Sequence, residues 1–264
     1  MNTKKELKSR LGSACNFTYD HYTDILQELK KSHKFTSFKN ATSNDIILRH
    51  DIDTSLHAAL KMAKIEKELG ISSTFFILLS SEFYNPISVD GSKIIREILA
   101  LGHKLGLHYN DIFIFENNVD ATETITTEIN LLEQHFNTKI EAVASHERVL
   151  AASKHNKKLS IKLPDGIVDA YSEEFFKKRK YLSDSAQFWR EGCLCQHLNK
   201  YEELQVLVHT MWWSHDGLSK DEIMDSFLGG EYDNYTHSVK LAKEKHQKHA
   251  NNMSQSRINK QVLK

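Results

Sequence analysis

Short apolar runs alternate along the chain with longer stretches of helical period. The first apolar run covers residues 46–48, and apolar side chains then recur every three or four residues across 58–69, as they do on one face of a helix. Gly70 is a residue type that commonly ends helices. Because alternation of this kind is typical of βα units around a mainly parallel sheet or barrel, the pattern predicts an α/β fold.

The same signals predict further elements on both sides of this unit. Strands are expected at 73–79, 104–108, 141–145, 166–171, 180–183 and 205–210, and helices at 19–29, 92–101 and 121–136. No proline-rich or glycine/serine-rich linker separates domains. We expect residues 1–44 to form a helical extension packed on the domain, 45–218 to form the α/β barrel, and 219–264 to form a charged helical extension. Its end, 251–264, has too few apolar residues to order itself.

Composition excludes several kinds of partner. Lys+Arg and Asp+Glu both number 35, so the chain lacks the basic excess of a nucleic-acid-binding protein. No apolar run approaches a membrane span, and the basic N-terminal residues have no apolar stretch behind them. Cys15, Cys193 and Cys195 form an odd set without paired metal-ligand spacing, so we expect Cys193 and Cys195 to be ordinary buried thiols. A reducing compartment and a cytoplasmic location follow, and homo-oligomerisation is left open.

Four predicted strands end in side chains that can carry chemistry. Asp51 and Asp53 follow the first strand, His108 and His146 end the strands at 104–108 and 141–145, and His209 lies in the last strand. Because the carboxyl ends of parallel strands share one rim, we expect these groups to meet. One of two neighbouring carboxylates can ligate a divalent cation while the other accepts a proton from water. The histidines supply neutral ligands and an acid for the leaving group.

Six segments resemble, in order, successive motifs of the polysaccharide deacetylase family, which is of the carbohydrate esterase family four type. They are ILRHDID, ALKMAKIEKELGI, STFFILL followed by SEFYNP, LGHKLGLHYN, SDS with FWREG, and LVHTMWW, within Asp45 to Ser214. The intracellular branch often found with surface-glycan biosynthesis enzymes is the most similar. The resemblance implies a distorted (β/α) barrel of about seven strands. It also implies a divalent metal ion, usually zinc, and hydrolysis of an N-acyl group on an amino sugar.

Residue roles come from this resemblance by position. Asp51 matches the catalytic base, Asp53 and His108 match metal ligands, and His209 matches the general acid. Asp184 and Trp189 fall in the segment that lines or supports the pocket. The residues expected to bind substrate are Asn110, Arg148, Asp184, Trp189 and Trp212.

The chain departs from the family pattern around the metal. Secreted members carry a second histidine where this chain has Ile112, and the intracellular branch commonly has an aspartate where this chain has Asn110. Asp111 and His146 are the available third ligands. We favour His146, because imidazole suits zinc and the residue ends a predicted strand.

Several of these residues also have structural interpretations. Asp51 and Asp53 could cap the helix that starts near Thr54. His103, at a helix end, is expected to be structural, and His50 is expected to pack or hydrogen-bond within the site and not to bind the metal. Of Trp212 and Trp213, one is expected to stack on a sugar and the other to lie in the core.

The predicted function is that of a metal-dependent hydrolase that removes an acetyl or formyl group from an amino sugar or glycan precursor. The carrier of the sugar would be a nucleotide or a lipid. One alternative is a catalytically degenerate family member that binds a glycan or a partner protein. Another is a hydrolase of a different non-peptide carbon–nitrogen bond.

Overall fold

The computed structural model describes residues 15–155, 159–230, 236, 239–240, 243–244 and 247–248. The chain divides into two compact units, Met1–Leu218 and Ser219–Lys264. The second unit contains a helix at 220–230, and the tail at 251–264 lies outside the described residues. None of the helices described is long and apolar enough to cross a membrane.

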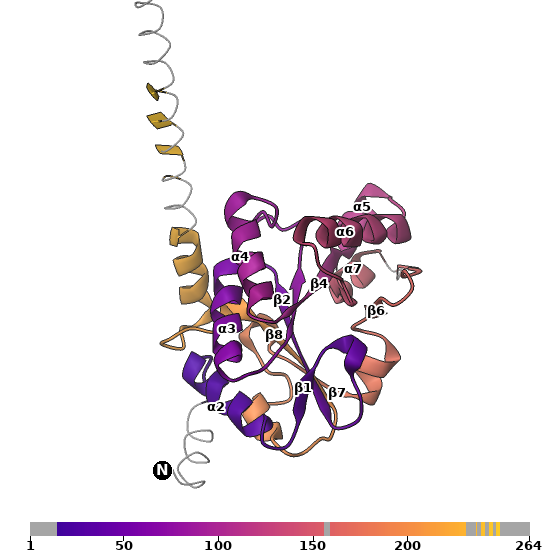
Figure 1. Ribbon diagram of the computed structural model, residues 1–264, viewed down its shortest axis with the longest axis vertical. Helices are drawn as coiled ribbons and strands as arrows, with labels where there is room; N and C mark the ends of the chain where they lie inside the picture. Colours follow the sequence, from indigo (N-terminus) through magenta and orange to yellow (C-terminus); the bar gives the residue numbers. More distant parts are fainter. Residues whose placement is uncertain are drawn as a thin grey trace, which may run out of the picture. The chain divides into compact units, whose positions relative to one another are not determined.

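A parallel sheet organises the first unit (Figure 1). Seven strands follow the order β6-β5-β4-β3-β2-β8-β7, and β1 pairs with the beginning of β2. The strands are β1 Lys34–Thr36, β2 Asp45–Ile52, β3 Thr74–Ile77, β4 Lys104–Asn110, β5 Ala142–His146, β6 Val168–Asp169, β7 Lys180–Ser183 and β8 Leu204–His209. The seven-strand path curls into a half-barrel, so the predicted distorted (β/α) barrel of about seven strands is confirmed.

Side chains from distant strands fill the inside of this curl. One apolar cluster contains Phe38, Ile47, Phe76, Ala142, Ala144, Ala170 and Phe175. The side-chain amide of Gln205 on β8 donates to the carbonyl oxygens of Ala170 at 3.1 Å and Phe175 at 2.9 Å. These two bonds tie the segment after β6 to β8 across the interior. They therefore stabilise the curl of the sheet at its β6 end, where β5 and β6 pair over only two residues.

Helices cover the outer face of the sheet. The main ones are α3 Leu56–Glu68, α4 Val89–Ala100 and α6 Ala121–Phe136, whose apolar stripes pack with β3, β4 and β5 in a second core cluster. Ser55 is the N-cap of α3, because its side chain accepts a hydrogen bond from Ala58 N. The alternative in which Asp51 or Asp53 caps this helix is therefore wrong. Both carboxylates are left for other contacts.

Two of the amphipathic helices agree with the predicted bounds. Helix α6 and helix α2, Tyr19–Leu29, have the predicted bounds. The short elements β1, α5 Asp111–Asn117 and α7 Arg148–His155 were not predicted, and β6 is shorter than expected. Elements this short span too few residues to establish a hydrophobic period.

The other elements are short helices of the 3₁₀ or π type. They are η1 Phe38–Asn40, η2 Glu174–Lys178, η3 Ser185–Gln187, η4 Leu194–His197 and η5 Thr210–Trp212.

Candidate metal centre

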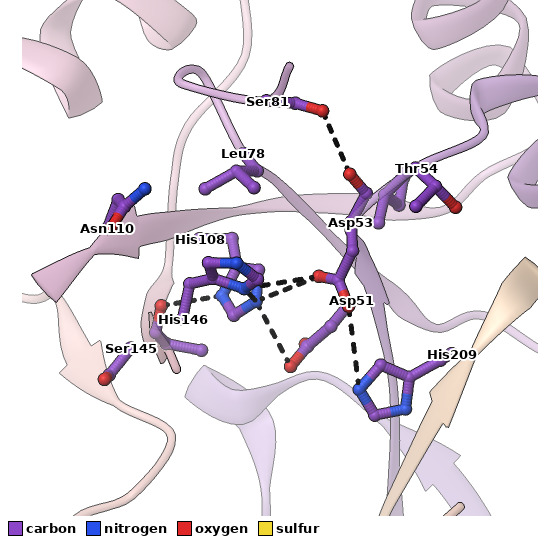
Figure 2. Close-up of polar contacts among 12 residues, drawn as sticks. Asp51, Asp53, Thr54, Leu78, Ser81, His108, Asn110, Ser145, His146 and His209 are labelled. Atoms are coloured by element: carbon purple, nitrogen blue, oxygen red, sulfur yellow. Dashed lines mark hydrogen bonds and ion pairs between the residues drawn. The ribbon is translucent and has the colours of Figure 1, made fainter. Parts of the chain in front are cut away.

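Four strands bring polar side chains to the carboxyl end of the sheet. In the pairing of β2 with β8, Asp51 lies opposite His209, and in that of β4 with β5, Asn110 lies opposite His146. Asp53 follows the last residue of β2. Figure 2 shows Asp51, Asp53 and the histidines gathered around one centre. Parallel pairing with this register therefore assembles residues that lie far apart in the chain.

Three ligand atoms form a small triangle in this centre. Asp53 Oδ1 lies 3.3 Å from His108 Nε2 and 3.5 Å from His146 Nδ1, and the two nitrogens are 3.2 Å apart. With zinc–ligand bonds of about 2.0–2.2 Å, the edges of a tetrahedral site measure roughly 3.3–3.6 Å. The triangle thus has nearly the size of one face of such a tetrahedron. Its three residues form a group that could hold a metal ion.

The donor chemistry of the triangle also fits a divalent cation. His108 Nδ1 lies 2.9 Å from the carbonyl oxygen of Ala144, and a carbonyl only accepts, so Nδ1 carries the proton. The lone pair of Nε2 then points toward Asp53, as in a metal-binding histidine. Asp53 Oδ1 is buried and receives no well-aligned hydrogen bond from the residues that the structure describes. A cation would satisfy this oxygen.

Asp51 lies beside the triangle and is held by a buried arginine. Arg49 Nε donates to Asp51 Oδ1 at 3.1 Å and Nη2 donates to Oδ2 at 2.7 Å, while Nη2 also donates to the hydroxyl of Tyr171 at 3.0 Å. Asp51 Oδ2 is 3.6 Å from His108 Nε2. Burial opposes ionisation of Asp51, but the charge and hydrogen bonds of Arg49 outweigh it and lower the pKa of the carboxyl. The carboxylate is therefore ionised near neutral pH.

Sequence reasoning assigned no role to Arg49 or Tyr171. Residues two apart in a strand face the same side of the sheet, so Arg49 could have been placed beside Asp51. Tyr171 lies in a distant segment, after β6, and the guanidinium of Arg49 lies 4.6 Å from the centre of its ring. No local pattern points to that contact.

His209 is held by Asp184 on the other flank of the triangle. Its backbone N–H and its Nδ1 both donate to Asp184 Oδ1, at 2.9 and 2.7 Å, and Trp213 Nε1 donates to Oδ2 at 2.9 Å. His209 Nε2 is 3.9 Å from Asp53 Oδ2. Burial opposes protonation, but the hydrogen bond and charge of Asp184 outweigh it and raise the pKa of His209 to about 9. The ring is therefore protonated at neutral pH.

Asp184 supports His209 from a fully buried position. Its carboxylate has no exposed surface and both of its oxygens accept hydrogen bonds from protein groups. These contacts are those of a residue that supports the pocket. Substrate binding by Asp184 stays a prediction. Trp213 lies in the core as the partner of that carboxylate.

The two residues that precede Ile112 in the sequence have other partners. Asn110 Oδ1 accepts from Phe113 N at 3.0 Å, which makes Asn110 the N-cap of α5, and its amide donates to Ser80 Oγ at 3.2 Å. Asp111 accepts a hydrogen bond from the hydroxyl of Ser145, and burial raises its pKa to about 6. Of the two candidate third ligands, the structure brings His146 and not Asp111 into the triangle.

The other residues expected to bind substrate have another partner or little exposed surface. The guanidinium of Arg148 lies 5.1 Å from the centre of the Tyr171 ring. Trp189 and Trp212 are each only 8% exposed. Substrate binding by these three residues and by Asn110 stays a prediction.

Two histidines lie behind the centre, on the face of the sheet that meets the helices. His50 stacks on Phe75, and its Nε2 is 2.7 Å from Glu66 Oε1 on α3, so the expectation that it packs within the site is wrong. Strand alternation explains this, because neighbours of Asp51 point away from it. His103 Nε2 is 3.0 Å from the carbonyl oxygen of Ala63, which confirms the structural role predicted for His103.

Comparisons with known proteins give structural similarity only. No protein-family model and no curated protein matches the chain. A family 4 carbohydrate esterase from Bacillus anthracis is similar, with 15% identity over 79% of this chain and 86% of that chain and a TM-score of 0.37. A peptidoglycan N-acetylglucosamine deacetylase has 15% identity over 80% and 91% of the two chains and a TM-score of 0.40.

A pseudoenzyme of the same carbohydrate esterase family from Bacillus anthracis is also similar. It has 13% identity over 72% of this chain and 60% of that chain, with a TM-score of 0.35. The similar structures thus include one described as a deacetylase and one described as a pseudoenzyme. Activity therefore has to be argued from the residues of this chain.

Proposed function

We propose that this protein is a metal-dependent amide hydrolase that removes an acetyl or formyl group from an N-acylated amino sugar, with zinc as its metal. The observation that carries the proposal is the triangle of Asp53, His108 and His146, flanked by Asp51 and His209. A divalent cation held by the triangle would polarise an acyl carbonyl and lower the pKa of a water molecule. Nitrogen and carboxylate ligands of this kind suit zinc.

Asp51 is proposed to accept the proton of the attacking water. Its two hydrogen bonds from Arg49 fix the carboxylate and keep it in the proton-accepting form. Asp53 lies two residues further along the same segment, and its Oδ1 is one of the three atoms of the triangle. The two aspartates of the HDID run thus take different roles because their partners differ.

His209 is proposed to protonate the departing amine. Asp184 holds the protonated ring through Nδ1, which leaves Nε2 as the nitrogen that faces the centre. In the reaction, water adds to the acyl carbon and the carbon–nitrogen bond breaks. One proton passes from water to Asp51 and another from His209 to the amine, so acetate or formate and a free amino sugar result.

The substrate class rests on the sequence motifs that resemble polysaccharide deacetylases. Nothing in the triangle itself distinguishes an acetyl from a formyl group or a nucleotide from a lipid carrier. The amino sugars to be tested are therefore free, nucleotide-linked and lipid-linked, each in N-acetyl and N-formyl form. Release of acetate or formate is the readout.

Metal content and turnover together test the proposal. The full chain is purified without chelators, its metals are quantified, and hydrolysis is measured with and without added zinc. Asp53→Ala and His146→Ala should each lose one equivalent of metal and all turnover. Asp51→Asn should retain the metal and lose turnover, because only the proton acceptor is removed.

Asp111→Asn is the matched control for the metal site. Asp111 is the alternative third ligand of the sequence analysis, but its carboxylate contacts Ser145, so this variant should retain the metal that His146→Ala loses. Loss of metal in Asp111→Asn with retention in His146→Ala would refute the ligand assignment. Metal binding with no hydrolysis of any amino sugar on the panel would overturn the proposed amino-sugar hydrolase and favour either a glycan-binding protein or a hydrolase of another carbon–nitrogen bond.

A further inference from the structure

A second group of metal-ligating side chains lies away from the proposed active site. Cys15 precedes helix α2, His21 lies in the first turn of that helix, and Cys193 and Cys195 lie at the start of turn η4. One ligand atom from each residue lies within 4.8 Å of every other. Cys15 and Cys195 are 180 positions apart in the chain, yet their sulfur atoms are 3.4 Å apart.

The dimensions of this group fit a tetrahedral zinc site better than a disulfide. With zinc–sulfur bonds of about 2.3 Å and zinc–nitrogen bonds of about 2.0–2.1 Å, the edges of such a site measure roughly 3.5–3.8 Å. The distance from Cys15 Sγ to Cys195 Sγ is 3.4 Å, and that from His21 Nε2 to Cys193 Sγ is 3.2 Å. A disulfide requires about 2.05 Å between sulfurs. These two distances would lengthen by only a few tenths of an ångström around the ion, and all the others in the group are at most 4.8 Å.

The ligand types agree with these dimensions. Three sulfurs and one imidazole form a soft donor set, which selects zinc over magnesium or calcium. Four protein ligands also fill a tetrahedral site and leave no position for water or substrate, as in structural zinc sites. His21 and Cys193 are buried, whereas Cys15 is exposed, so the group has a dry side and a side that is open to entry of the ion.

We propose that Cys15, His21, Cys193 and Cys195 bind a zinc ion in a closed, structural Cys₃His site. The three thiols lose their protons on binding and the imidazole binds through Nε2. Sequence spacing argued for ordinary thiols at Cys193 and Cys195 because no second cysteine pair follows them. The missing ligands come from the segment before and within α2.

The proposed zinc would join the segment around α2 to the segment that contains η4. The α2 segment also contacts the chain that follows β8 and η5: Tyr19 N donates to Ser214 O at 2.9 Å, and Ser214 N donates to Phe17 O at 2.9 Å. Phe17 and Tyr22 also pack on Trp213, with ring centres 5.1 and 5.0 Å away. Because Trp213 is a partner of Asp184, the zinc would stabilise a layer behind His209 without contacting it.

Metal counting in paired variants tests this site separately from the proposed active site. The full chain, purified under reducing conditions with zinc and without chelator, should hold one equivalent that Cys15→Ser loses and Asp53→Ala keeps. Cys15 is exposed, so the serine variant should fold. His21→Ala provides a second variant with the same expected loss. His57→Ala is the matched control, because His57 is an exposed histidine and the variant should keep all the metal.

Cobalt(II) replacement identifies the ligands. Thiolate ligands give cobalt an intense near-ultraviolet charge-transfer band, which should be present in Asp53→Ala and lost in Cys15→Ser and His21→Ala. The proposal is overturned if the folded chain holds no equivalent that depends on Cys15 and His21, or if cobalt gives no thiolate band. Failure of the active site would leave this band unchanged, so the two proposals fail independently.

Discussion

Replacing Asp184 with asparagine should lower the pKa of His209 from about 9 toward the ordinary value of an imidazole. Asp184 is fully buried and accepts the Nδ1 proton of His209 at 2.7 Å. Asparagine has nearly the same shape and can still accept this hydrogen bond through its side-chain oxygen, but it carries no charge. The variant therefore tests the charge while the position of the ring is maintained.

The magnitude follows from the rise in pKa. A rise from 6.5 to about 9 corresponds to about 3 kcal/mol in favour of the protonated ring. A charge in direct contact commonly shifts a pKa by about 1–3 units, so Asp184→Asn should bring His209 to roughly 6–8. Trp213 Nε1 also loses its acceptor, which should cost about 1–3 kcal/mol of folding free energy.

The assay is an NMR titration of the His209 ring in the metal-free protein, with the signal assigned by its loss in His209→Gln. Trp213→Phe is the control: it removes the other partner of Asp184 but leaves the charge, so the pKa of His209 should stay near 9. An unchanged pKa in Asp184→Asn, or an equal fall in both variants, would refute the electrostatic explanation.

Unfolding measured against pH gives a second readout of the same charge. The raised pKa of His209 contributes stability that is complete below 6.5 and is lost as the pH rises through about 9. Asp184→Asn should remove most of this decline. The metal-free protein is again the form to measure, because a bound cation changes the charges around His209.

Three further predictions concern other buried charged groups. Arg49→Met should destabilise the protein by roughly 3–5 kcal/mol in urea unfolding, because Asp51 stays buried without its counter-charge; equal stability in Arg49→Met and the parent would contradict this. Glu66→Ala should cost a similar roughly 3–5 kcal/mol, since Tyr22, Ser73 and His50 all contact that buried carboxylate, and a thermal midpoint within error of the parent would count against it. Burial raises the pKa of Glu128 from 4.5 to about 7, so the parent loses stability as the pH rises through this interval. Glu128→Gln should lack that loss and be more stable above pH 7 by at most about 3 kcal/mol, and parallel stability–pH curves would exclude this cause.

The hydrophobic pattern alone predicts the fold class and its longest elements. Helix α6 was predicted with its observed bounds because its sixteen residues keep one apolar stripe throughout. Strand β6, with two residues, is stabilised by contacts with distant segments, including the bonds from Gln205 to Ala170 and Phe175 that follow it. Such contacts leave no periodic signal.

The same distinction applies to the proposed active site. The ends of the strands can be predicted from the sequence. Side chains at these ends are expected to meet at one rim of a parallel sheet, and they are Asp51, Asp53, His108, His146 and His209. The sequence favoured His146 over Asp111 as the third candidate ligand, and the tertiary structure shows what separates the two residues. Helix α5 starts directly after β4, and the Asp111 carboxylate at its first position bonds to Ser145 while His146 faces Asp53.

The sequence by itself thus determined the α/β class and the rim of strand ends where the candidate metal ligands lie. Both follow from the spacing of apolar side chains within single segments, which has a period of two residues in strands and 3.6 in helices. Only the tertiary structure decided which groups pair. Arg49 with Tyr171 and Cys15 with Cys195 meet through packing of segments more than 100 residues apart. The local pattern of residues specifies which face a side chain occupies and carries no information about what lies opposite that face.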